Sequence, residues 1–161
     1  MEQEKMHELA IKVGEKLLKH GLSLTTIESC TGGWVAKILT DIPGSSSWFE
    51  RGFVTYTNES KQDMLGVQAS TLQQHGAVSE QVVREMARGG QARSRADVSL
   101  AVSGIAGPGG GTADKPVGTV WLAWAAGKNL RTLHVHLSGE RSRIREQAVE
   151  LALQGVLDII G

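Results

Sequence analysis

Hydrophobic and polar positions along this chain repeat with the period of a helix in some segments and with that of a strand in others. The first helical pattern has apolar residues three and four positions apart. They are Met6, Leu9, Ala10, Val13 and Leu17. Gly21 follows as a stop signal, so we predict an amphipathic helix that ends near this glycine. A second long helical pattern begins at about Glu140 and continues to the end of the sequence.

Short segments rich in β-branched, aromatic and other apolar residues lie between the helical patterns and predict strands. They cover 22–27, 48–56, 97–103, 117–126 and 130–137. The last two flank Gly127, which predicts a hairpin and therefore an antiparallel pair of strands. We also predict a helix through Trp34, a short helix or turn over 58–65, and a helix capped by Ser79. This interleaving predicts an α/β fold, a three-layer sandwich in which helices flank a mixed β-sheet.

The composition limits the class of protein. With 161 residues the chain has the length of one typical domain, and we assign 1–161 to a single domain. It carries 17 basic and 17 acidic residues, so the basic excess typical of nucleic-acid and membrane-surface proteins is missing. We therefore expect neither of these partners. The composition leaves open whether the chain forms a homo-oligomer.

Cysteine content and the N-terminal segment indicate a compartment. Cys30 is the only cysteine, which excludes an intramolecular disulfide and favours a reducing environment. The N-terminal segment lacks the apolar stretch of a signal peptide, and no apolar run approaches the roughly 18 residues of a membrane-spanning helix. These features predict a cytoplasmic protein without a membrane span.

Several common catalytic motifs are missing. None of the five histidines lies in an HExxH pattern and there is no CxxC pair, which argues against a zinc site. There is no phosphate-binding GxxxxGK[ST] loop, and the glycine-rich segment does not match GxGxxG. We therefore expect neither a metal nor a cofactor.

The motif ESCTGG places hydroxyl groups where a strand ends and a helix begins. Free N–H groups and the helix dipole at such a place favour anions and developing oxyanions. Ser29 therefore suits a nucleophile, and the following Cys30, Thr31, Gly32 and Gly33 suit contacts to substrate or oxyanion. The alternatives are that Ser29 or Thr31 only caps the helix, or that Cys30 is the nucleophile. Only one of Ser29 and Cys30 can face the site, because adjacent strand residues point to opposite sides.

The motif GFVTYTNESK contains a second set of candidates. Lys61 can act as a general base only if burial or a neighbouring cation lowers its pKa. Tyr56 could pass the proton or fix the lysine, and Asn58 is a candidate substrate contact. The alternative is a surface lysine beside a core tyrosine, since most lysines are exposed.

A third candidate segment, SGIAGPGGG, follows a predicted buried strand. Glycines let backbone N–H groups approach a ligand closely, so Ser103, Gly104 and Gly107 are candidate substrate contacts. Lys115 lies just beyond and is a candidate anchor for an anionic group. The alternative is a flexible surface loop.

Together the motifs ESCTGG, GFVTYTNESK, SGIAGPGGG, KPVGTVW and SGERSRIREQA resemble the C-terminal domain of the competence/damage-inducible CinA proteins. The resemblance runs from about Leu9 to the final helix. It implies an α/β fold and a metal-independent amidase of pyridine nucleotide recycling, which hydrolyses nicotinamide mononucleotide to nicotinate mononucleotide and ammonia. The family is described with a serine–tyrosine–lysine arrangement, which corresponds to Ser29, Tyr56 and Lys61 here. A non-catalytic nucleotide-binding regulatory domain is the alternative.

A mononucleotide substrate also needs a partner for its phosphate. Arg141 and Arg145 lie four residues apart on one face of the last predicted helix and could bind it together. The alternative is that both form surface ion pairs with neighbouring glutamates. The helix start at 31–33 and Lys115 are competing anchors.

Overall fold

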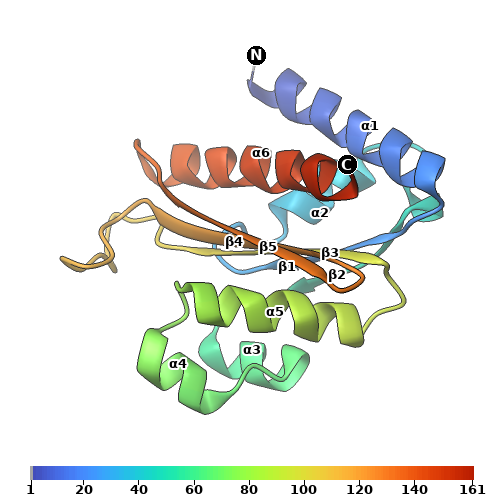
Figure 1. The fold of residues 1–161 in the computed structure, drawn as a ribbon. Helices are drawn as coiled ribbons and strands as arrows, with labels where there is room; N and C mark the ends of the chain where they lie inside the picture. The colour runs from blue at the N-terminus through green and yellow to red at the C-terminus, as the bar shows by residue number, and fades with distance from the viewer. Residues whose placement is uncertain (1) are drawn as a thin grey trace.

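The computed structural model describes residues 2–161 and has three layers, with a β-sheet in the middle (Figure 1). One face of the sheet is covered by α1 (Glu2–His20), α2 (Trp34–Thr40) and α6 (Arg141–Ile160). The other side holds α3 (Asn58–Leu65), α4 (Ala69–His75) and α5 (Glu80–Ala92). A short 3-10 turn, η1 (Ser45–Ser47), follows α2.

The sheet has five strands in the order β2-β1-β3-β4-β5. They are β1 (Leu24–Glu28), β2 (Phe49–Val54), β3 (Val98–Gly104), β4 (Thr119–Ala126) and β5 (Asn129–His136). The strands β2, β1 and β3 run parallel, whereas β4 and β5 join antiparallel as the predicted hairpin. The prediction of an α/β sandwich with a mixed sheet is confirmed.

Apolar side chains form a core on each face of the sheet. Strand β1 is buried along its whole length because it has a strand on either side and helices over both faces. Its side chains alternate between the faces. Leu24 packs in the core under α1 and α6, and Ile27 packs in the core over α5. This alternation also decides which side of the sheet each residue after β1 faces.

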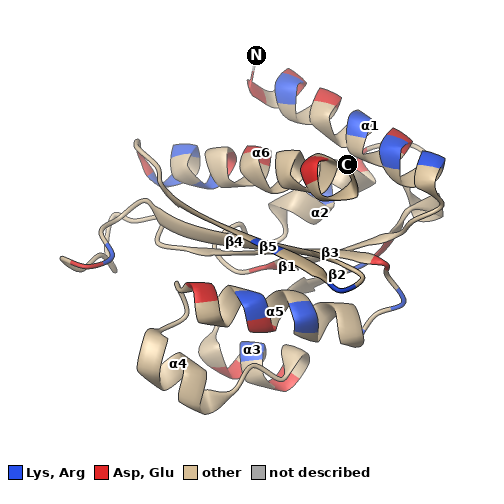
Figure 2. Ribbon diagram, viewed as in Figure 1, with Lys and Arg blue, Asp and Glu red and all other residues tan. Residues whose placement is uncertain are grey.

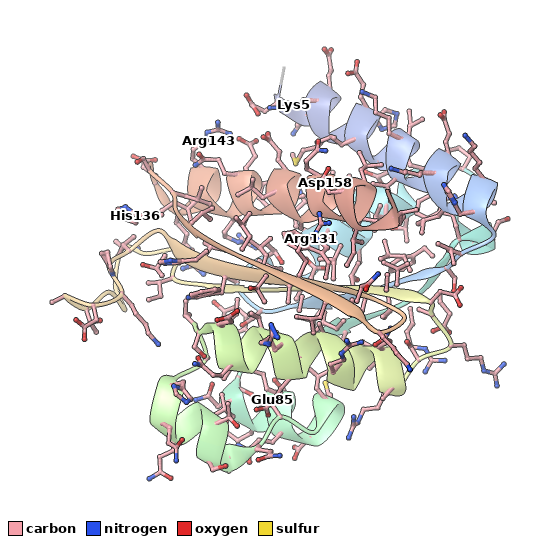
Figure 3. All side chains as sticks on the ribbon, in the orientation of Figure 1. Lys5, Glu85, Arg131, His136, Arg143 and Asp158 are labelled. Atoms are coloured by element: carbon pink, nitrogen blue, oxygen red, sulfur yellow. The ribbon has the colours of Figure 1, made fainter. Side chains whose placement is uncertain are left out.

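The helices α1 and α6 pack against each other above the sheet, and their outer surfaces carry ion pairs (Figure 3). Lys5 Nζ lies 3.4 Å from a carboxylate oxygen of Glu150, and Arg143 Nη1 lies 3.5 Å from one of Glu2. Ion pairs with a solvent-exposed partner typically contribute about 1 kcal/mol or less each. The apolar contacts beneath them therefore hold the two helices together.

Basic and acidic residues are interspersed along helices on both sides of the sheet (Figure 2). This distribution agrees with the equal numbers of basic and acidic residues. Among residues 2–161, no helix has both the length and the apolar character needed to cross a membrane.

Helix α4 is an element that the hydrophobic pattern did not predict. Its sequence ASTLQQH contributes a single buried apolar side chain, Leu72, so no periodic stripe marks it. It is fixed by contacts with α5, where Thr71 Oγ1 donates a hydrogen bond to Glu85 at 2.6 Å. The backbone N–H of Gln68 donates to the same carboxylate at 2.8 Å. A tertiary partner thus stabilises a helix that its own sequence marks only weakly.

Candidate active site

Residues from three strands meet at one edge of the sheet. Because β1, β2 and β3 are parallel, their C-terminal ends lie at the same edge. The chain leaves β1 toward α2 on one face and leaves β2 toward α3 on the opposite face (Figure 1). Such a switch point opens a crevice at the carboxyl ends of the strands, which is where α/β proteins bind ligands.

A serine and a lysine form the centre of this site. Lys61 Nζ lies 2.9 Å from Ser29 Oγ and donates a hydrogen bond to the Thr55 carbonyl at 2.7 Å. The Lys61 side chain is fully buried, and within residues 2–161 no carboxylate pairs with it. Helix α3 begins at a capping box formed by Thr57 and Ser60, which fixes the turn that carries the lysine.

Burial lowers the pKa of the Lys61 ammonium from 10.5 to about 8, an effect that the nearby Cys30 thiol partly opposes. Desolvation disfavours the charged form of a lysine, and no acidic partner restores it. About a tenth of the Lys61 side chains are therefore neutral amines at pH 7, and about half at pH 8. A neutral amine 2.9 Å from Ser29 Oγ can accept the hydroxyl proton.

Ser29 and Cys30 point to opposite sides of the sheet, as the strand alternation predicts. Ser29 faces α3 and Lys61, whereas Cys30 packs in the apolar core on the side of α1 and α6. Burial raises the pKa of the Cys30 thiol to about 11, although the Arg145 guanidinium acts in the opposite direction. Because the thiolate is the reactive form, this environment makes Cys30 a poor nucleophile. The geometry favours Ser29.

A cavity of about 270 Å³ opens above the serine and lysine, and eight of the predicted site residues line it. They are Ser29, Cys30, Tyr56, Lys61, Ser103, Gly104, Gly107 and Arg141. The wall is completed by Ala77, Val78, Ile105, Ala106, Gly109 and Gly110. The structure thus gathers residues from all three sequence motifs, together with the first residue of α6, around one space.

The predicted glycine-rich segment is anchored where it leaves β3. Ser103 Oγ donates a hydrogen bond to the Ala77 carbonyl at 3.0 Å, and the residue is only 1% exposed. Gly104 is in close contact with its surroundings, since a Cβ there would lie 2.7 Å from Val120 Cγ2 and 3.2 Å from Cys30 Sγ. The beginning of the glycine-rich segment is therefore packed as part of the cavity wall. Residues 109–114, farther along, are exposed and form a surface loop.

Tyr56 takes a different position from the one proposed from the sequence. Its side chain is 57% exposed, and its hydroxyl accepts a hydrogen bond from Arg141 Nη2 at 3.1 Å. The contact to Lys61 comes instead from the Tyr56 carbonyl, at 3.5 Å from Nζ. Arg141 also donates from Nη1 to the Gly107 carbonyl at 2.8 Å. The phenol therefore helps to position Arg141 at the mouth of the cavity, while the Thr55 carbonyl fixes the lysine.

The remaining predicted residues do not line this cavity. Thr31, Gly32, Gly33 and Arg145 line a separate cavity on the other side of the turn. Their hydrogen bonds explain this, since Arg145 Nε donates to the Cys30 carbonyl at 2.9 Å and its Nη2 donates to the Thr31 carbonyl at 3.2 Å. Arg141 and Arg145 therefore do not act as a pair, and Arg145 holds the turn that follows the serine.

Asn58 and Lys115 also lie outside the cavity. Asn58 is the exposed first residue of α3, where its carbonyl accepts a hydrogen bond from the Gln62 amide at 3.4 Å. The Lys115 ammonium donates to the carbonyl of His75 at the end of α4, which directs it away from Ser29. The structure supports neither residue as a contact to a substrate in the cavity.

Glu28 was not identified from the sequence, although it is the first letter of ESCTGG. Its carboxylate is fully buried and accepts hydrogen bonds from Thr31 Oγ1 at 2.6 Å, from Val35 N at 2.9 Å and from Ala36 N at 3.0 Å. Gly33 occupies the N-cap position of α2 and has no side chain to cap it. Glu28 takes over that role from the preceding strand and fixes the turn around Ser29.

Comparison with known proteins agrees with this architecture. The sequence model described as the CinA C-terminal domain matches residues 6–160. The chain belongs to the CinA C-terminal domain family. The family predicted from the sequence motifs is thereby confirmed.

Two kinds of curated CinA-family relatives are similar to the chain. Nicotinamide-nucleotide amidohydrolase PncC of Escherichia coli strain K12 is 54% identical over 155 residues, which cover 96% of this chain and 94% of that protein. A CinA-like protein of Akkermansia muciniphila is also 54% identical, over 88% of this chain but only 34% of its own length. The chain thus matches stand-alone relatives nearly end to end and matches one part of longer CinA-like proteins.

Solved structures of the family share the fold. The crystal structure of the competence/damage inducible protein CihA from Agrobacterium tumefaciens superimposes with a TM-score of 0.96 at 46% identity. The match covers 98% of this chain and 96% of that one.

Within residues 2–161, no three His, Cys, Asp or Glu side chains gather into a potential metal site.

Proposed function

We propose that this protein is a nicotinamide-nucleotide amidohydrolase, which converts nicotinamide mononucleotide and water to nicotinate mononucleotide and ammonia. The observation that carries the proposal is the buried Lys61 amine at 2.9 Å from Ser29 Oγ in a cavity of mononucleotide size. Stand-alone relatives that carry this name, such as the Escherichia coli protein, align with nearly the whole chain. We further propose that 1–161 act as a single catalytic domain.

In the first step, Ser29 Oγ attacks the carboxamide carbon and Lys61 accepts the hydroxyl proton. A serine hydroxyl is a weak nucleophile unless a base removes its proton, and Lys61 is the base within hydrogen-bond reach. The tetrahedral intermediate then expels ammonia, and the Lys61 ammonium supplies the proton that the leaving nitrogen needs. This step leaves nicotinate mononucleotide bound to Ser29 as an ester.

In the second step, water hydrolyses this ester. Lys61, neutral again, accepts a proton from the water as the water attacks the ester carbon. The Ser29 oxygen leaves and regains its proton from Lys61. The products are a free serine and the carboxylic acid of nicotinate mononucleotide, which releases its proton to solvent and becomes the carboxylate. The lysine thus begins and ends the cycle as an amine.

The turn after Ser29 limits which backbone groups can stabilise the oxyanion. The N–H of Gly32 donates to the Ser29 carbonyl, and those of Val35 and Ala36 donate to Glu28. No carbonyl within residues 2–161 accepts a hydrogen bond from the N–H of Cys30. We infer that Cys30 N–H, next to the nucleophile, forms one side of the oxyanion hole. One such donor is typically worth about 10²- to 10³-fold in kcat.

Arg141 is the proposed anchor for the substrate phosphate. It lines the cavity and is held in place by Tyr56 and Gly107, and the guanidinium plane suits a phosphate. We expect Arg141→Ala to raise KM for nicotinamide mononucleotide by about 10- to 100-fold, with a much smaller change in kcat. Steady-state kinetics will measure both constants.

The matched control for Arg141 is Arg143→Ala, two residues along the same helix. Arg143 is bound to Glu2 and Glu146 on the outer surface, so its loss is expected to leave KM within about twofold. If Lys115→Ala raised KM and Arg141→Ala left it unchanged, the phosphate would be assigned to Lys115, at the other end of the glycine-rich loop.

The pKa of Lys61 predicts how the rate depends on pH. The base must be neutral to accept the serine proton, and it is protonated below its pKa of about 8. We therefore expect kcat/KM to fall about tenfold per pH unit well below pH 8 and to level off above it. Initial rates at pH 6 to 10, within the range where the protein stays folded, will test this. A flat profile from pH 6 to 9 would contradict a lysine base.

Ammonia release from nicotinamide mononucleotide, measured with purified protein and a metal chelator, tests the proposed function directly. We expect steady turnover that the chelator does not reduce, with nicotinate mononucleotide formed in equal amount. Tight binding of the mononucleotide without ammonia release, in protein shown to be folded, would overturn the proposal in favour of a regulatory nucleotide-binding domain.

A further inference from the structure

A second and larger cavity lies on the other side of the turn that follows Ser29. Its volume is about 700 Å³, compared with about 270 Å³ for the cavity above Lys61. Its lining residues come from α1, α2, α6 and the segments next to α2. The three helices cover the same face of the sheet (Figure 1). Met6, His7, Trp34, Lys37, Ile38 and Arg145 are among its lining residues. The proposed hydrolysis makes no use of this space.

The cavity carries an excess of positive charge. Arg145 is a half-buried guanidinium that forms no ion pair within residues 2–161. Its Nε and Nη2 donate to the carbonyls of Cys30 and Thr31, while its Nη1 has no acceptor among the described residues. Lys37 adds a second cation, balanced by Asp41 at 2.7 Å. A guanidinium with a free nitrogen and no carboxylate attracts an anion.

The same cavity also has an aromatic wall. The Trp34 indole is half-buried, with Met6 and Ile38 beside it in the lining. The guanidinium carbon of Arg145 lies 5.7 Å from the centroid of the Trp34 ring. A flat ring can stack on an indole, and an anionic group on the same molecule would then lie within reach of Arg145.

We propose that this cavity is a second binding site, for a mononucleotide that regulates the enzyme. The heteroaromatic base stacks on Trp34, and the phosphate binds Arg145 Nη1 and Lys37. Inorganic phosphate lacks the ring and a nucleoside lacks the charge, so both bind much more weakly than the complete mononucleotide. The cavity is more than large enough for such a ligand.

Arg145 connects this site to the nucleophile. It holds the carbonyls of Cys30 and Thr31, which belong to the two peptide groups directly after the one whose N–H is proposed to face the oxyanion. A phosphate that competes for the guanidinium weakens these hydrogen bonds and lets the turn shift. Occupancy of the second site then lowers kcat. This part of the proposal rests on the proposed amidohydrolase function.

Calorimetry with adenosine 5′-monophosphate tests the site without relying on turnover, because this probe has no carboxamide to hydrolyse. We expect one site per chain, with Lys37→Glu weakening binding about tenfold or more. The matched control is Lys12→Glu, an exposed lysine of α1 outside the cavity, which makes the same change in net charge and is expected to bind as the wild type does. Adenosine and inorganic phosphate, tested separately, are expected to bind at least about tenfold more weakly.

A second titration distinguishes the two cavities. In Ser29→Ala protein saturated with nicotinamide mononucleotide, adenosine 5′-monophosphate is expected to bind still, and in kinetic assays of the wild type it is expected to lower kcat rather than raise KM. The second site would be overturned if nicotinamide mononucleotide displaced adenosine 5′-monophosphate and if Lys37→Glu bound adenosine 5′-monophosphate as tightly as the wild type does. No heat of binding at millimolar concentration would overturn it as well. Binding that depends on Lys37 would support the site even if ammonia release failed.

Discussion

Replacing Ser29 with alanine is expected to lower kcat for nicotinamide mononucleotide by about 10⁴-fold or more, with the fold intact. The hydroxyl is the proposed nucleophile, and no other hydroxyl or thiol lies within hydrogen-bond distance of Lys61 Nζ in residues 2–161. The substitution removes one small group and leaves the Lys61 contact to the Thr55 carbonyl in place. Ammonia release, with circular dichroism as the check on folding, measures the loss.

Cys30→Ala is the matched comparison for Ser29→Ala, because it removes the adjacent side chain and keeps the backbone N–H. We expect it to retain most of the activity, since the buried thiol faces the opposite core and its pKa is raised to about 11. A small loss of stability is expected from the unfilled volume in that core. Loss of turnover in Cys30→Ala, with activity retained in Ser29→Ala, would assign the nucleophile to the cysteine.

The opposite orientation of Ser29 and Cys30 could be anticipated from local patterns in the sequence, whereas the burial of Lys61 could not, because most lysines are exposed. The alternation of β1 puts Ile27 and Ser29 on the side of α3 and α5, and puts Glu28 and Cys30 on the other side. Because β1 and β2 are parallel, the residues that follow them must lie at one edge. The alternation of side chains along a strand is a property of a short segment, so it can be predicted from the order of residues alone.

The contacts that cross from one element to another could not be anticipated in the same way. Arg141 and Arg145 share one face of α6, but four residues span about 6 Å along a helix. That shift moves one guanidinium into the mouth of the reaction cavity and the other onto the carbonyls of Cys30 and Thr31. The angle at which α6 crosses the sheet decides this, and helical spacing carries no information about that angle.

Glu28 shows the same limit for a buried charge. In the sequence it is a single acidic residue at the end of a strand, and such residues are usually exposed. Its burial makes sense only beside the N-terminus of α2, where Gly33 leaves backbone N–H groups without a side-chain cap. The sequence does contain one signal for this role of Glu28, which is a carboxylate a few residues before a glycine at the N-cap position of a helix.

Replacing Lys61 with methionine is expected to abolish turnover while making the protein more stable near neutral pH. The loss of the base should lower kcat by about 10³-fold. The gain has a different origin, because burial of the Lys61 charge lowers its pKa from 10.5 to about 8 and so costs folding free energy wherever the lysine is protonated. That cost is about 3 kcal/mol below pH 8 and is relieved as the pH rises toward 10.5. Methionine fills a similar volume without a charge.

The pH dependence of this stability difference separates the charge from packing. Methionine leaves the Ser29 hydroxyl and the Thr55 carbonyl without a partner, which costs about 1 to 2 kcal/mol at every pH. Only the charge contribution changes with pH, so the advantage of Lys61→Met over wild type in urea unfolding should shrink by about 2 kcal/mol between pH 7 and pH 10. The other titrating groups are shared by the two proteins and largely cancel in the difference, and the nearby Cys30 thiol, whose pKa of about 11 lies above this range, contributes little to it. A constant difference from pH 7 to pH 10 would mean that Lys61 keeps its ordinary pKa, and it could then not serve as the neutral base that the reaction needs.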